Sequence, residues 1–416
     1  MQPILECCCG VDVHKDMIEA CIIKGLENTE YIRMQFSTFP NSLKEFAEWL
    51  YKNDCYHIAM ESTGVYWRPV YEAIEANCPY YESIIVANAH NMRNLPGRKT
   101  DVKDAEWIAT LLQHGLLEPS FVPERMIRDL REFSRIYKNA VSDKTRTLNR
   151  LEKFLQTHGF KLSSVLSDIN SVSGMNILKL LSQKGSLTTV ETLSALRGKH
   201  KHTAEEIQKA ICGTLNSNEC FLLQDFIDEV KHIQEHINKI LGKMQEIAEP
   251  YSEILERLDS IPGIDVTAAL LILAEIGDCP NKTFKTSKHL CSWAGLSPRN
   301  DESAGKIKSK KIMPGNPYVK SILCQVAWVA VKNRKNPLGN WFWSHQAKLG
   351  KKKAIIAALR KILCKKESKQ IRKQITNMVF RLENGGIHLP LLTARSMLYD
   401  GMRTVGVNNG ILHRAY

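Results

Sequence analysis

The 416-residue sequence has no run of about 18 apolar residues, the length that a helix needs to cross a bilayer. Its beginning, MQPILECCCGVDVHKD, has no basic segment ahead of the apolar stretch, so it does not resemble a secretory signal peptide. We therefore expect no membrane partner and a cytoplasmic location. A hydrophobic fraction of 44% and a charged fraction of 24% are ordinary for folded proteins and argue against a largely disordered chain.

The sequence also has no CxxC pair among its 12 cysteines. Cys7, Cys8 and Cys9 are contiguous in an apolar run, and neighbouring residues of a strand point to opposite faces, so these three thiols cannot converge on one metal ion. Without an export signal a disulfide framework is not expected either. We predict buried, reduced cysteines and no zinc site.

Positive charge is concentrated in one part of the chain. Residues 299–373 contain 20 Lys and Arg against 3 Asp and Glu, a local balance of +17, whereas the whole chain carries +13 and its remainder therefore −4. A strongly cationic region on a slightly acidic body is typical of a polyanion-binding face. A solvated helical surface is the plainer alternative.

Hydrophobic patterning divides the chain into parts. Short apolar runs at 4–13, 17–23, 31–36, 57–60 and 83–87, with helical spacing at 41–52, 66–77 and 101–114, predict a mixed sheet with packed helices over residues 1–125. Residues 126–250 lack strand signals. There, residues 126–158 have a long helical pattern, and apolar residues from Leu223 to Ile247 recur with alternating spacings of three and four. That pattern predicts a coiled-coil seam, which would require an oligomer, or a long bundle helix.

A third region, 251–365, is predicted to be mainly helical, with helices at 266–276, 317–332 and 348–363, and residues 366–416 form a basic tail. The segment SIPGI at 260–264 resembles a helix–hairpin–helix turn, which can present backbone N–H groups to a phosphate; a plain interhelical turn is equally compatible. Trp293, Trp328, Trp341 and Trp343 are candidates for base stacking, although tryptophans at helical spacing more often belong to the core.

Four acidic residues follow strands or begin a helix in the first region. Asp12 closes the first strand, Glu61 follows the strand HIAM, and Asp101 and Asp104 lie three apart at a predicted helix start. Strand ends and helix starts at one edge of an α/β sheet can converge. Carboxylates gathered there would repel one another unless Mg²⁺ or Mn²⁺ lay between them, and such ions can assist phosphodiester displacement. Taken singly, Asp101 or Asp104 is more simply a helix cap.

These residues carry a family resemblance. GVDVHKD, MESTG, NLPGRKTDVKDAEWIA, IPGI, WAGLSPRNDESAGK and PGNPYVKSIL occur in order between about residues 8 and 363. Together they resemble the DEDD transposases of the insertion-sequence 110 family, site-specific recombinases with a RuvC-like, RNase H-fold N-terminal domain and a C-terminal domain that supplies a serine. The resemblance implies an α/β plus all-α protein that uses Mg²⁺, binds DNA at the element ends and target, works as a homo-oligomer (dimer or tetramer) and is guided by a structured noncoding RNA from its element.

The resemblance also assigns roles to residues. The acidic tetrad falls on Asp12, Glu61, Asp101 and Asp104, and the catalytic serine on Ser303, in the element Ser303-Ala304-Gly305 where the family usually has Gly at the second position. Ser303 lies in a polar segment that we expect to be a loop, and an unactivated serine needs a metal or base nearby. Ser62 and Ser297 are weaker candidates for the nucleophile. Ser62 is more simply a helix N-cap, and Ser297 a residue that makes hydrogen bonds within a loop. His14 is interpreted as a surface residue, with contact to a phosphate or a metal ion as the alternative.

Eight cations are candidates for nucleic-acid contacts, and the run Lys351-Lys352-Lys353 would contact backbone phosphates, which gives affinity without sequence choice. They are Arg299, Lys306, Lys308, Lys310, Lys311, Lys351, Lys352 and Lys353. The expected activity is cleavage, exchange and rejoining of DNA strands through a serine–DNA link. The rival hypotheses are a metal-dependent RuvC-like nuclease that uses water and an inactive nucleic-acid-binding relative.

Overall fold

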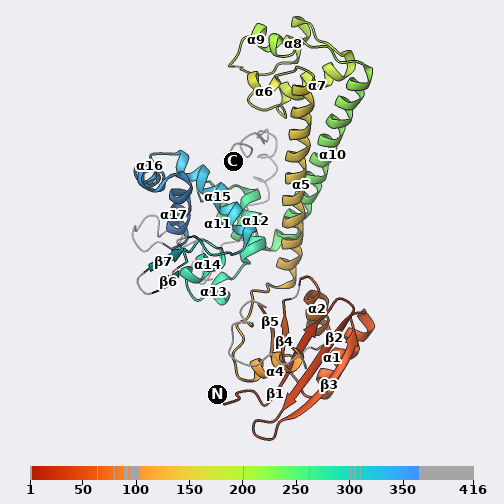
Figure 1. Ribbon diagram of the computed structural model, residues 1–416, viewed down its shortest axis with the longest axis vertical. Helices are drawn as coiled ribbons and strands as arrows, with labels where there is room; N and C mark the ends of the chain where they lie inside the picture. The colour runs from red at the N-terminus through yellow and green to blue at the C-terminus, as the bar shows by residue number, and fades with distance from the viewer. Residues whose placement is uncertain are drawn as a thin grey trace, which may run out of the picture. The chain divides into compact units, whose positions relative to one another are not determined.

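Five strands form a mixed sheet in the first of two units, Met1–Val122, of a computed structural model (Figure 1). The second unit is Pro123–Tyr416. The structure describes residues 2–62, 64–78, 80–88, 92, 104–199, 201–261, 263–299, 301–303, 306–309 and 311–364. Asp101 and Lys310, two of the predicted site residues, and the predicted basic tail at 366–416 therefore lie outside the described residues.

The strand order in the sheet is β3-β2-β1-β4-β5. β1 pairs antiparallel with β2, which pairs antiparallel with β3, whereas β1 and β4, and β4 and β5, are parallel. The strands are β1 (Cys7–Val13), β2 (Met17–Lys24), β3 (Glu30–Ser37), β4 (His57–Glu61) and β5 (Ser83–Ala87). The antiparallel strands precede the parallel ones in the chain, and the predicted mixed sheet is confirmed.

Helices cover both faces of the sheet. α1 (Pro40–Lys52) and α2 (Trp67–Asn77) bury Phe46, Leu50 and Ile74 in a core with Val11, Met60 and other strand residues. α4 (Asp104–Gln113) packs Ile108 and Leu112 against the opposite face. Successive residues of β1 face opposite sides of the sheet. Cys8 belongs to the core beneath α4, and Cys9 to the core beneath α1 and α2.

Two long helices form an antiparallel pair in the second unit: α5 (Arg125–Thr157) and α10 (Ser217–Ile247). Arg150 of α5 contacts Glu229 of α10 at 2.7 Å, and Lys144 of α5 contacts Gln234 of α10 at 2.6 Å. The earlier residue of α5 therefore contacts the later residue of α10, as expected for antiparallel helices. The apolar seam from Leu223 to Met244 is thus covered by α5 of the same chain. The seam is therefore explained without a second copy of the chain.

The far end of this pair carries a cap of four helices with a core of its own. Phe160, Ile177 and Ile207 join Leu155 of α5 and Leu223 of α10 in one buried cluster. The sequence patterns did not identify these helices, which are α6 (Leu162–Val165), α7 (Val172–Lys184), α8 (Thr189–Ala195) and α9 (Ala204–Ala210).

The remaining helices form the C-terminal part of the second unit, together with a short hairpin. The predicted helices at 266–276 and 317–332 are confirmed as α12 (Val266–Ile276) and α15 (Pro317–Lys332). The Lys-rich helix predicted at 348–363 begins later, at Lys351, as α17 (Lys351–Cys364). The preceding helix α16 (Pro337–Leu349) includes Lys348 and Leu349, and Gly350 separates the two helices. The other elements are η1 (Glu249–Tyr251), α11 (Ser252–Asp259), α13 (Pro280–Thr283), α14 (Ser287–Trp293), β6 (Asp301–Ser303) and β7 (Lys306–Ser309).

The expected fold class, a mixed α/β domain followed by a helical part, is confirmed by this arrangement. Among the described residues, no helix combines the length and hydrophobicity that crossing a bilayer requires. The described cysteines are all free thiols and six of them are buried, but Cys212 is exposed, so the prediction of buried cysteines is wrong there. Burial raises the pKa of the Cys8 thiol.

Candidate active site

Asp12 and Glu61 lie side by side at the carboxyl ends of two parallel strands. The β1–β4 register pairs Gly10 with Ala59 and Val11 with Met60, which places Asp12 of β1 next to Glu61 of β4. Val11 and Met60 are buried in the core beneath α1 and α2. Since strand residues alternate between faces, Asp12 and Glu61 belong to the opposite face, the one that α4 covers.

Gly10 brings α4 unusually close to this face. A Cβ at Gly10 would lie 2.2 Å from the carbonyl oxygen of Ala105 and 2.3 Å from the nitrogen of Ala109, so only glycine allows the helix to approach β1 at this point. Cys8 lies against Ala109, its Sγ 3.5 Å from that carbonyl oxygen. Following β1 from Cys8 to Gly10 therefore leads toward the start of α4, and the next residue on this face is Asp12.

Asp104 is the first residue of α4 and directly precedes Ala105. Three of the four predicted carboxylates, Asp12, Glu61 and Asp104, are thus brought to one face and one end of the sheet. The fourth, Asp101, is outside the described residues. The sequence signals for the three acids were their places at strand ends and a helix start. The role of Gly10 was missed, although a glycine within an apolar strand is a recognised sign of close backbone approach.

The donor chemistry of this face suits a hard cation. Asp12 is mostly buried, with 15% of its side chain exposed, and its Oδ2 lies 3.0 Å from Nε2 of His14, whose own side chain is 58% exposed. His14 is therefore a surface residue, as interpreted, yet it contacts the predicted tetrad. Carboxylate oxygens are the ligands that Mg²⁺ and Mn²⁺ prefer. Within the residues that the structure describes, no three His, Cys, Asp or Glu side chains gather closely enough to hold a metal ion.

Ser303 is the last residue of β6 and not part of a loop, which corrects the expectation from its polar surroundings. Its backbone pairs with Lys306 of β7, and the two strands continue from a bridge between Pro298 and Ile312. The N–H of Arg299 donates to the carbonyl of Lys311 at 2.9 Å. A two-stranded hairpin therefore presents Ser303 next to its tip.

Several predicted cations are solvent-exposed. Arg299 and Lys311 are exposed at the base of the hairpin, and Lys351, Lys352 and Lys353 are exposed in the first turn of α17. Lys306 and Lys308 belong to β7, and Lys310 is outside the described residues. The N-terminal end of a helix dipole is positive, and the first turn of α17 adds lysines and no acid. This uncompensated positive charge favours binding of an anion.

The tryptophans and the SIPGI segment are mostly accounted for by packing. Nε1 of Trp343 donates to the carbonyl of Val331, and Trp328 packs edge-on against Phe342. A Cβ at Gly263, whose φ is +95°, would lie 2.9 Å from the carbonyl of Val326, so this glycine allows close packing on α15. The plain interhelical turn therefore explains the glycine without a phosphate.

Two family models match the chain. Residues 9–160 match the DEDD transposase model of the IS110 type, and residues 255–343 match the transposase IS116/IS110/IS902 family. The chain belongs to the IS110 transposase family. The first match spans the positions of all four predicted acids, and the second spans the Ser303 hairpin and the helices that support it.

Two curated relatives of this transposase have similar length. The pilin gene-inverting proteins of Moraxella bovis and Moraxella lacunata are each 23% identical to it over 370 residues, which are 85% of this chain and 92% of the relative. The protein is therefore an enzyme of the DNA transposase or recombinase class, and its partner is DNA. DEDD transposases generally use a divalent metal ion.

Proposed function

We propose that this IS110-family transposase recombines DNA at specific sites through a transient covalent link between Ser303 and a DNA phosphate. The observation that supports the proposal is that Asp12, Glu61 and Asp104 belong to one face and one end of the sheet, in a chain whose second family match contains Ser303 on a hairpin. The relatives, named for inversion of a pilin gene, support rearrangement at defined sites over simple degradation.

Asp12, Glu61, Asp104 and Asp101 would hold the divalent ion, and we propose Mg²⁺ or Mn²⁺ because the donors are carboxylates. When bound, such an ion offsets the negative charge on a phosphodiester and lowers the pKa of a nearby hydroxyl. His14, which contacts Asp12, would hold that carboxylate in place. Asp12, Glu61 and Asp104 belong to β1, β4 and α4, which supports the proposal because a site of this kind requires ordered elements.

In the proposed reaction the hydroxyl oxygen of Ser303 bonds to phosphorus and the bond from phosphorus to one deoxyribose oxygen breaks. The serine proton leaves to a base or to water, and the departing deoxyribose oxygen takes up a proton, so the step is a transesterification without redox change. Rejoining reverses these bonds with a hydroxyl from another strand end. The number of phosphodiester bonds is conserved because the serine ester stores one of them.

Binding of nucleic acid is proposed for the cationic surfaces. Arg299, Lys306, Lys308, Lys310 and Lys311 belong to the hairpin or its continuation, and Lys351, Lys352 and Lys353 begin α17. A local balance of +17 over residues 299–373 favours phosphate backbones as ligands. We propose that these surfaces hold DNA and a structured guide RNA of the element. We also propose that the protein acts in the cytoplasm as a dimer or tetramer. The guide RNA and the oligomer are proposed from the family resemblance.

The proposal is tested by incubating the protein with its element ends, the flanking transcript and Mg²⁺ and by separating the products on a denaturing protein gel with labelled DNA. We expect an adduct that needs Ser303, Asp12 and Mg²⁺, so Ser303→Ala and Asp12→Asn should abolish it. Ser309→Ala is the matched control, because Ser309 belongs to the same hairpin, on β7. Cleavage without an adduct that survives Ser303→Ala would refute the serine assignment and leave a nuclease that uses water.

A further inference from the structure

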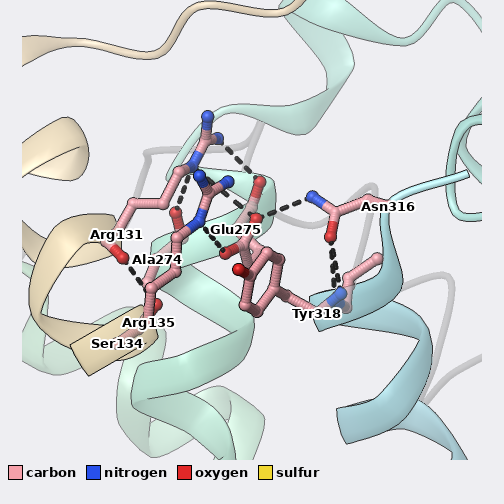
Figure 2. Close-up of polar contacts among 8 residues, drawn as sticks. Arg131, Ser134, Arg135, Ala274, Glu275, Asn316 and Tyr318 are labelled. Atoms are coloured by element: carbon pink, nitrogen blue, oxygen red, sulfur yellow. Dashed lines mark hydrogen bonds and ion pairs between the residues drawn. The ribbon is translucent and has the colours of Figure 1, made fainter. Parts of the chain in front are cut away.

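The apolar helix α12 of the second unit contains a fully buried carboxylate. Glu275 has no exposed surface and lies near the end of α12, whose sequence is VTAALLILAEI. Burial of an unpaired charge is expensive, so such a residue persists only where several partners bind it. Figure 2 shows these partners around Glu275.

Two arginines of α5 bind Glu275. Nε of Arg135 lies 3.3 Å from Oε1, and Nε of Arg131 lies 3.7 Å from Oε2. Arg131 also donates to the backbone carbonyls of Ala274 and Glu275, at 3.1 and 2.9 Å, and so caps the end of α12. Burial lowers the pKa of Arg131 to about 10, with the charge of Glu275 opposing that shift, so the guanidinium stays protonated at neutral pH.

Asn316 is the third partner of Glu275 and comes from a different element. Its Nδ2 donates to Oε2 of Glu275 at 2.6 Å, while its Oδ1 accepts from the N–H groups of Tyr318 and Val319 and caps α15. Arg135 lies over the ring of Tyr318, 4.6 Å from its centroid. The start of α15 is thereby held against both α5 and α12 (Figure 2).

Asn316 also closes the base of the hairpin that carries Ser303. Its backbone N–H donates to the carbonyl of Trp293 at 3.0 Å. Next to it, a Cβ at Gly315 would lie 2.2 Å from the nitrogen of Gly295, so the two segments touch backbone to backbone. The N–H of Met313 then donates to the carbonyl of Ser297, at 3.0 Å.

The same pair of segments continues through the bridge of Pro298 with Ile312 and the bond from Arg299 to Lys311, and ends at the pair of Ser303 with Lys306. Contacts between described residues therefore recur along both segments, from Glu275 and Asn316 to the pair of Ser303 with Lys306.

We propose that Glu275 is a positioning residue for the reaction: bound by Arg131 and Arg135, it anchors Asn316 and so fixes the placement of the Ser303 hairpin relative to α5 and α12. This inference rests on the proposed function of Ser303. Glu275 itself is buried and does not contact DNA. Its effect is on the alignment of the nucleophile, and alignment errors near 1 Å cost on the order of 100-fold in rate.

The test uses the full-length chain and three variants. Glu275→Gln keeps the size of the side chain but places an amide against arginine donors. Asn316→Ser keeps a good N-cap for α15 and removes the group that reaches Glu275. Asn336→Ser is the matched control, because Asn336 also caps a helix that begins with proline, α16. For each variant we would measure the adduct rate at saturating element-end DNA with transcript and Mg²⁺, the DNA dissociation constant, and hydrogen exchange of the Arg299 and Met313 amides.

We expect Glu275→Gln and Asn316→Ser to speed exchange at both amides by roughly 10- to 100-fold, the equilibrium effect of one lost charged hydrogen bond. The adduct rate should fall by on the order of 100-fold, with DNA binding changed less than about twofold and Asn336→Ser without effect. Asn316→Ser decides the outcome if Glu275→Gln does not fold. The inference is overturned if exchange is unchanged, if the adduct rate is unchanged, or if the rate falls only in proportion to DNA binding.

Failure of the proposed function gives a different pattern. If Ser303→Ala forms the adduct as well as the wild-type protein, the serine assignment is wrong whatever Glu275 does, and with it the positioning role. If Ser303→Ala abolishes the adduct while Asn316→Ser leaves its rate unchanged, the proposed function stands and the role of Glu275 is rejected.

Discussion

Replacing Gly10 by alanine tests whether the close approach of α4 to β1 builds the acidic face. The added Cβ would lie 2.2 Å from the carbonyl oxygen of Ala105 and 2.3 Å from the nitrogen of Ala109. Both contacts are with backbone atoms of a helix, so no side-chain rotation relieves them. α4 must move away from the sheet by about 1 Å to restore ordinary van der Waals distances.

The expected cost follows from two features of this site. Overpacking of a well-packed core costs about 1–3 kcal/mol, and a clash with backbone falls at the upper end, so we expect a loss of roughly 3 kcal/mol in the unfolding free energy. Movement of α4 also carries Asp104 away from Asp12 and Glu61. Activity in the adduct assay should then fall by on the order of 100-fold, because alignment is lost.

Native-state hydrogen exchange of the full-length chain is the suitable assay, since it reports opening free energies segment by segment. We expect reduced protection in β1 and α4, and unchanged protection in α10. Gly242→Ala is the matched control, because a Cβ there meets nothing within 4 Å and alanine favours the interior of α10 by roughly 0.5–1 kcal/mol. A loss below about 0.5 kcal/mol in Gly10→Ala would refute this account of the acidic face.

Two further predictions concern the helical part of the chain. Gln234→Leu leaves the buried ammonium of Lys144 without its 2.6 Å acceptor. We expect it to lower the unfolding free energy, measured in urea, by about 1–3 kcal/mol. The double variant Lys144→Met with Gln234→Leu should recover most of this loss, and no recovery would contradict the pairing. Hydrogen bonds from Lys184 and Thr188 lower the pKa of Glu191 from 4.5 to about 2. The stability that this carboxylate adds is therefore present above pH 4.5 and is lost as the pH falls toward 2. The melting temperatures of wild type and Glu191→Gln should therefore converge on acidification, and a constant difference would argue against the pairing.

Local patterns predicted most of the fold. The spans 266–276 and 317–332 agree with α12 and α15 residue for residue, because capping residues and apolar spacing mark both ends of these helices. The helices α6, α8 and α9 were missed, since elements of four to seven residues show little periodicity outside their tertiary context. The 13-residue helix α7 was missed too, although Ser171 at its N-cap and Gly185 at its C-cap are ordinary helix signals. The β6–β7 hairpin was predicted as a loop because its polar residues lack a strand pattern.

The candidate site was predictable only as a set of residues. Asp12 and Glu61 were identified from their places at strand ends, but their common face became evident from the β1–β4 register and from Gly10. Glu275 was not recognised at all. A single acid in an apolar helix was its only local signal, and its arginine partner Arg131 lies 144 residues away in the sequence. Contacts of that separation leave no periodicity in the chain.

The antiparallel pairing of α5 with α10 implies an order of assembly. The bond from Arg150 to Glu229 closes a separation of 79 residues and the bond from Lys144 to Gln234 one of 90, whereas Arg131 reaches Glu275 across 144. Because closing a longer loop costs more entropy, we expect the cap of α6 to α9 to form first and the two long helices to zip from there. The bonds from Arg131 to the end of α12 would then form after the pairing of α5 with α10, whereas the bond from Asn316 to Glu275 spans only 41 residues. A newly made chain therefore completes the anchor of its Ser303 hairpin only when α12 and α15 pack on the assembled pair of long helices.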